Sequence, residues 1–113
     1  MRQAEAMPVT VEDKVAQNLL ERLAPGLYDA VLDAIESSRD GIAASGIRVY
    51  STTEGDDPTW EELAFEVRVT AERQDASCYW DRISDELQRL MDVSQGPARD
   101  QLIQSISVIV RRS

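Results

Sequence analysis

Residues 59–71 alternate apolar and polar side chains with a period of two, which is typical of a strand with one buried face. The apolar side chains are Leu63, Phe65, Val67, Val69 and Ala71, and the polar ones are Glu62, Glu66, Arg68 and Thr70. Further along the chain the pattern changes to a helical period and then back to a strand. This change predicts an α+β fold.

A shorter alternating stretch precedes this strand, and a run of turn-forming residues separates the two. The region 46–71 is therefore predicted to form a β-hairpin. A turn centred on Asp56 places Val49 opposite Leu63, which brings both apolar sets to the same face of the hairpin.

The region 10–43 is predicted to form two amphipathic helices joined in an αα hairpin, after a disordered tail over residues 1–9. Thr10 is expected to cap the first helix, because apolar residues recur every four positions from Val11 onward. Pro25 ends the first helix and fits the first turn of the second.

After the β-hairpin, apolar residues at helical spacing predict a helix over residues 76–92. Its apolar stripe consists of Trp80, Ile83, Leu87, Leu90 and Met91. A short helical turn is expected over residues 98–102, and alternation over residues 103–111 predicts the last strand. The inward side chains of that strand are Ile106, Val108 and Val110.

All 113 residues are expected to form a single domain, since a chain of this length buries enough apolar surface to fold without a metal or a disulfide. A right-handed crossover places the last strand beside the first, which gives a three-stranded sheet in the order 2-1-3. This split βαβ arrangement resembles an incomplete ferredoxin-like sheet. We expect helices on one face of the sheet and an open second face.

The charge of the chain restricts its partners. Its 12 basic and 21 acidic residues give a net charge of −9, which repels nucleic-acid phosphates and anionic lipid and favours basic partners. No apolar stretch is long enough for a membrane span, and the N-terminus lacks the apolar block of a signal peptide. We therefore expect a cytoplasmic protein without nucleic-acid or membrane partners.

The chain carries few groups for catalysis or metal binding. It has no histidine, so its single cysteine, Cys78, has no imidazole partner and is interpreted as small apolar filling. The acidic residues within 54–62 lack EF-hand spacing and are interpreted as a solvated hairpin tip, with a Ca²⁺ or Mg²⁺ site as the alternative. No cofactor and no metal is expected.

The open sheet face carries the candidate binding residues. It combines aromatic, aliphatic and arginine side chains, which are common at protein interfaces, with glutamates. The candidates are Arg48, Tyr50, Trp60, Glu62, Glu66, Arg68 and Ile109. The alternative is a solvated face where arginine and glutamate pair across strands, or a face partly covered by the N-terminal helices.

Together these patterns favour a non-catalytic interaction protein, such as an adaptor, an antitoxin-like or inhibitor-like partner, or a subunit of an oligomer. A homodimer held through the open sheet face is the simplest case. A small-ligand-binding regulatory domain of the ferredoxin-like type and a carboxylate-based enzyme are the alternative functions.

Overall fold

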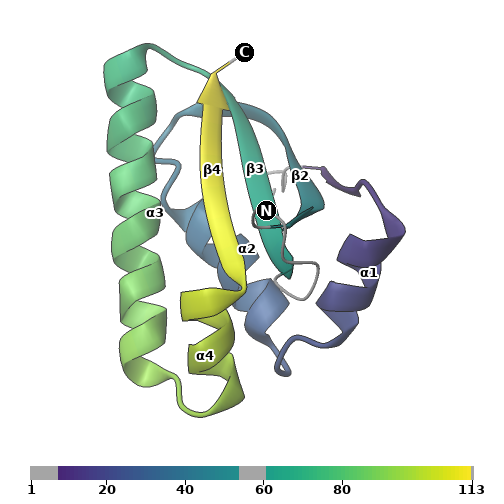
Figure 1. The fold of residues 1–113 in the computed structure, drawn as a ribbon. Coiled ribbons are helices and arrows are strands. Elements are labelled where there is room, and N and C mark those ends of the chain that lie inside the picture. Colours follow the sequence, from purple (N-terminus) through teal and green to yellow (C-terminus); the bar gives the residue numbers. More distant parts are fainter. Residues whose placement is uncertain (1–7, 54–60, 113) are drawn as a thin grey trace, which may run out of the picture.

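A mixed sheet forms one layer of the protein (Figure 1). The computed structural model describes residues 8–53 and 61–112. The strands of this sheet are Val9–Val11 (β1), Ala43–Thr53 (β2), Glu61–Thr70 (β3) and Ile106–Arg112 (β4). They lie in the order β1-β2-β3-β4, with β2 and β3 antiparallel, β1 parallel to β2, and β4 parallel to β3.

Helices pack on one face of this sheet (Figure 1). Those of the described chain are Lys14–Glu21 (α1), Leu27–Ser37 (α2), Arg73–Val93 (α3) and Pro97–Gln104 (α4). Their buried side chains form one apolar core with the inward residues of β3, which are Leu63, Phe65, Val67 and Val69, as the alternation predicts. None of these four helices is long and apolar enough to cross a membrane.

The expected three-stranded sheet in the order 2-1-3 is wrong, because β4 lies beside β3 and a fourth strand is present. The edge of β2 that the last strand was expected to use is occupied by β1, where Val9 pairs with Ile47 and Val11 with Val49. β4 therefore pairs with the remaining edge of β3. The split βαβ arrangement, and with it the ferredoxin-like resemblance, does not hold. Residues 1–7 of the expected tail lie outside the described ranges.

The N-terminal region also differs from the expected αα hairpin over 10–43. The helix cap is Asp13 rather than Thr10, since Asp13 Oδ1 accepts a hydrogen bond from the backbone N–H of Ala16 at 2.7 Å. α2 ends at Ser37, earlier than the expected end at residue 43. A helix that continued to residue 43 is excluded, because the backbone turns left-handed at Asp40 (φ 48°) and Gly41 (φ 84°) before β2 begins.

The β-hairpin forms on the expected face but in a different register. Val49 pairs with Phe65 instead of Leu63. A shift of two residues keeps every side chain on its own face, because side chains alternate along a strand. The run of turn formers between the strands does not select a single turn centre, so the pattern specifies the face but not the pairing.

Tyr79 is the aromatic residue that α3 buries, and the prediction that Trp80 belongs to the buried stripe is wrong. Tyr79 is fully buried, and its hydroxyl donates a hydrogen bond to the carbonyl of Ile35 at 2.8 Å, which connects α3 to α2. Trp80 is 47% exposed. The buried residues of α3 are Ala76, Tyr79 and Ile83, and Leu87, Leu90 and Met91 of the expected stripe pack against the core. Trp80 is therefore the member of that stripe that does not belong to it.

The last two elements follow the prediction more closely. α4 contains the expected turn over residues 98–102 and continues to Gln104, so β4 begins later than expected, at Ile106. Its alternate residues pair with inward-facing residues of β3, which confirms the expected face of Ile106, Val108 and Val110.

Candidate interaction surface on the open sheet face

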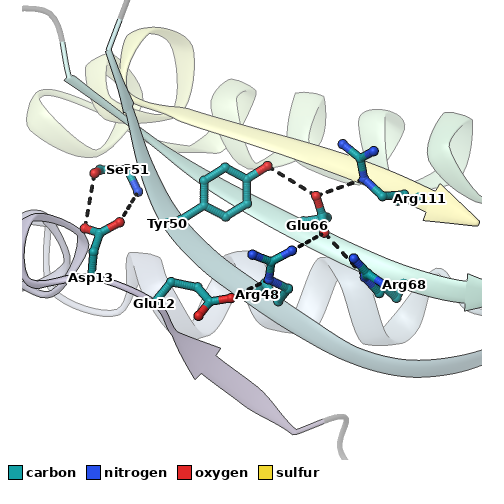
Figure 2. A network of polar contacts seen from close by, with 8 residues as sticks. All are labelled: Glu12, Asp13, Arg48, Tyr50, Ser51, Glu66, Arg68 and Arg111. Carbon is teal, nitrogen blue, oxygen red and sulfur yellow. Dashed lines mark hydrogen bonds and ion pairs between the residues drawn. The ribbon is translucent and has the colours of Figure 1, made fainter. Parts of the chain in front are cut away.

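The sheet face away from the helices carries arginines around one buried glutamate (Figure 2). Cross-strand pairing brings them together, since Arg48 lies opposite Glu66 and Arg68 lies opposite Arg111. Tyr50 follows Arg48 by two residues on β2 and therefore shares its face. We call Arg48, Tyr50, Glu66, Arg68 and Arg111 the Glu66 cluster.

Each oxygen of the Glu66 carboxylate has two partners in the cluster. Arg111 Nε donates a hydrogen bond to Oε2 at 3.0 Å, and the Tyr50 hydroxyl donates to the same oxygen at 3.3 Å. Arg48 donates to Oε1 at 3.3 Å, and Arg68 Nε lies 3.6 Å from Oε1. The Arg48 guanidinium carbon also lies 5.7 Å from the centroid of the Tyr50 ring.

Glu66 is held in its ionised form. Burial alone would raise the pKa of Glu66, but the hydrogen bond and charge of Arg111, with Tyr50 and Arg48, outweigh burial and hold this pKa below its ordinary value. Burial, and then the negative charge of Glu66, raise the pKa of Tyr50. Tyr50 therefore keeps its proton and acts as a donor to the carboxylate.

The guanidinium groups of the cluster are half exposed, whereas the carboxylate beneath them is not. The side chains of Arg48, Arg68 and Arg111 are 44%, 45% and 57% exposed, against 3% for Glu66. Glu12 forms a second ion pair with Arg48, and this hydrogen bond raises the pKa of Arg48. Three arginines of the cluster thus meet Glu66 and Glu12, and the half-exposed charged groups of the cluster are all guanidiniums, on a chain that carries −9.

Four of the sequence candidates belong to the cluster, namely Arg48, Tyr50, Glu66 and Arg68. Ile109 lies beside it on β4, opposite Glu66, and is half buried. Glu62 lies on the same face nearer the start of β3 and has no ion pair with a described residue. Trp60 lies outside the described ranges.

Two residues of this network were not among the candidates. Arg111 follows the alternation of the last strand to the open face, so its position in that pattern is the signal that selects it. Glu12 belongs to a segment that the apolar spacing assigned to a helix, and nothing in the sequence pattern places it beside Arg48. The expected alternative of arginine–glutamate pairing across strands is present on this face.

Cys78 does not fill the core as expected but is exposed. It lines a hollow of about 490 Å³ together with Asp40, Glu72 and Asp75.

Within residues 8–53 and 61–112, no group of three or more carboxylate or cysteine side chains is placed to hold a metal ion. Most of the acidic residues within 54–62 lie outside these ranges.

The chain matches no protein-family model, and the comparisons with curated proteins and with solved structures found no match. The chemistry of the Glu66 cluster is therefore the main guide to function. Guanidinium groups held in fixed positions bind carboxylates through paired hydrogen bonds. Such groups, half exposed on an open sheet face, are suited to binding an anionic surface.

Proposed function

We propose that the protein is a non-catalytic binding protein that holds a partner protein against the open face of its sheet. The observation that carries this proposal is the Glu66 cluster, in which one buried carboxylate orients three half-exposed guanidinium groups. The net charge of the whole chain favours basic partners, but the charged groups that the Glu66 cluster exposes are guanidiniums. The matching surface of the partner therefore carries carboxylates.

Glu66 favours binding because it restricts the rotamer freedom of the arginine side chains before a partner binds. Free arginine side chains lose rotamer freedom when a partner immobilises them, and this loss weakens association. Here the contacts to Glu66 already limit that freedom, while the outer N–H groups remain available. Tyr50 and the half-buried Ile109 add aromatic and aliphatic area between the charges.

A second copy of the chain fits this description in part, because each copy carries 21 acidic residues. Glu66 is not available to pair with arginines of another copy, since arginines of its own chain surround it. Two Glu66 clusters placed face to face would repel each other. A homodimer would therefore have to pair this cluster with an acidic surface elsewhere on the second copy.

The test compares two doubly substituted variants of equal net charge. The first, R48Q/R68Q, removes two exposed guanidinium groups and leaves Glu66 with its other two partners. The control, R89Q/R99Q, removes two exposed arginines that lie away from the face, on α3 and α4. A partner is identified by copurification from the native host and produced separately, and its Kd for each form is measured at low and high salt.

We expect R48Q/R68Q to weaken binding by about 1.5–3 kcal/mol, because hydrogen bonds to charged groups contribute that much. Its remaining affinity should also depend less on salt, since fewer ion pairs are left to screen. R89Q/R99Q should bind like the wild type. Equal Kd values for the two variants, or wild-type binding that salt does not weaken, would contradict the proposal.

A further inference from the structure

β4 is an edge strand, and alternate peptide groups along it face away from the sheet. The N–H of Leu63 donates to the carbonyl of Ser105 at 2.7 Å. In a parallel ladder, every second residue of a strand directs both of its peptide groups to the same neighbour. Ser105 and the residues at even spacing from it therefore face β3, whereas the peptide groups of Val108 and Val110 face the open edge.

The C-terminal half of this edge is free to pair with another strand. The carbonyl of Val108 accepts a hydrogen bond from Nε1 of Trp80 at 3.2 Å. Among the described residues, no backbone or side-chain group bonds to the outward peptide groups of Val110. Unpaired N–H and C=O groups along a sheet edge are a template for an added strand.

A groove of about 520 Å³ lies beside this part of the edge, between β4 and the first turns of α3. We call it the β4 groove. Ala76 and Trp80 of α3 contribute to its apolar wall. Its charged lining residues are all arginines, namely Arg73, Arg111 and Arg112, and no carboxylate lines it.

Two of these arginines have no carboxylate partner among the described residues. Arg112 Nε donates instead to the carbonyl of Ala71 at 3.0 Å, which holds the side chain close to the start of α3. Arg73 is the first residue of α3, where the positive end of the helix dipole adds to its charge. Arg111 forms an ion pair with Glu66. The charged side chains that line the β4 groove are therefore all positive, on a protein whose net charge is −9.

We propose that the β4 groove binds an extended acidic segment of a partner protein, which joins the sheet as a strand beside β4. The backbone of the segment pairs with the outward groups of Val110, its carboxylates pair with Arg73 and Arg112, and its apolar side chains pack against Trp80. A second copy of β4 is a poor occupant, because its own Arg111 and Arg112 would enter a positive groove. The site lies at the sheet edge and does not depend on the function proposed for the open face.

Fluorescence anisotropy of labelled peptides on the full chain tests the proposal. The probe is a peptide in which valine and glutamate alternate. One comparison peptide replaces glutamate with lysine. A second keeps the glutamates but carries N-methyl groups on alternate backbone amides, which blocks strand pairing without changing charge. We expect micromolar binding of the parent peptide and weakening by about tenfold or more for each comparison peptide.

Two matched variants locate the binding. R73E reverses the charge of the groove at the first turn of α3, where a carboxylate is also compatible with the helix dipole, so folding is preserved. R89E reverses an exposed arginine near the other end of the same helix. R73E should weaken binding of the parent peptide by about tenfold, R89E should not, and R48Q/R68Q should leave it intact.

Several results would overturn the inference. Equal binding of the N-methylated peptide would show that charge alone attracts the probe. Equal binding by R73E and R89E, or the absence of binding, would exclude the groove. A dimer in light scattering that W80A converts to monomer, and that the peptide does not dissociate, would assign this edge to a second copy of the chain.

Discussion

Glu66 is a buried carboxylate whose desolvation is offset by its neighbours. Burying a charge is unfavourable unless partners and hydrogen bonds replace the lost water. Arg111, Tyr50 and Arg48 replace it here, at 3.0 to 3.3 Å. Because these arginines keep one side in water, each ion pair contributes modestly to stability. The main consequence is a fixed arrangement of exposed guanidinium groups.

Replacing Glu66 with glutamine should destabilise the fold by about 1–3 kcal/mol at neutral pH, because hydrogen bonds to a charged buried group are lost. The effect should depend on pH. Since the folded pKa of Glu66 is depressed, its contribution is present above the unfolded value, about 4.3, and disappears as pH falls through the folded value. Urea unfolding from pH 3 to 7 measures this, and E66Q should lose less stability on acidification than the wild type. If the free energy of unfolding of E66Q and of the wild type changed equally with pH, this prediction would be contradicted.

The buried hydroxyl of Tyr79 provides a second prediction for a single residue. Y79F removes its hydrogen bond to the carbonyl of Ile35 but keeps the ring, so we expect a loss of about 0.5–1.5 kcal/mol in chemical denaturation. Y28F is the control, because the hydroxyl of Tyr28 has no hydrogen bond to a described residue and its ring lies beside Phe65. An equal loss of stability in Y79F and Y28F would show that the Tyr79 hydrogen bond does not contribute to the free energy of unfolding.

Among the elements, α1 is attached to the sheet through its own cap. Asp13 accepts from the N–H of Ala16 within the helix and from Ser51 of β2, whose N–H and hydroxyl lie at 3.3 and 3.1 Å. The Ala16 hydrogen bond, aided by those from Ser51, holds the pKa of Asp13 below its ordinary value. One carboxylate therefore starts a helix and fixes its position.

Removing this carboxylate should loosen α1 specifically. D13A should cost about 1–2 kcal/mol in the free energy of unfolding, as expected for the loss of an N-cap. D13N keeps a capping oxygen and should cost less. Hydrogen exchange of the α1 amides locates the change, and protection that stays at the wild-type level in D13A would show that the cap is dispensable.

The elements that could be predicted from the sequence are those with long periodic patterns. β3, α3 and β4 carry enough alternating or helical positions to reveal their type and buried face. β1 does not, since its three residues become a strand only by pairing with Ile47 and Val49, distant in the chain. The sheet order depended on β1, so it was mispredicted together with that strand.

Part of the candidate site could also be predicted from the alternation of side chains along the strands. Alternation placed Arg48, Tyr50, Glu66 and Arg68 on one face without any knowledge of their contacts. It could not show that Glu66 is buried under them, because burial depends on which strand lies on each side of β3. The exposure of Trp80 was mispredicted, because Trp80 and Tyr79 are adjacent at the border of the apolar stripe and helical spacing alone does not decide which ring is buried.

At the scale of the whole molecule, one apolar core accounts for folding. EDTA should therefore leave the melting temperature unchanged, as followed by circular dichroism. Ca²⁺ or Mg²⁺ added afterwards should have no effect either. A drop of several degrees on chelation that either ion restores would show that the acidic residues within 54–62 form a site.

The outer strands bring both ends of the described chain to the same end of the sheet. Val9 pairs with Ile47, Ile47 with Val67, and Val67 with Val110, a row that crosses every strand. Neighbouring strands lie about 4.8 Å apart, so Val9 and Val110 are separated by roughly 14 Å. A linker of only a few extended residues is long enough to cover this distance. A backbone-cyclised form should therefore keep the fold and melt at a higher temperature, because ring closure removes conformational freedom from the unfolded chain.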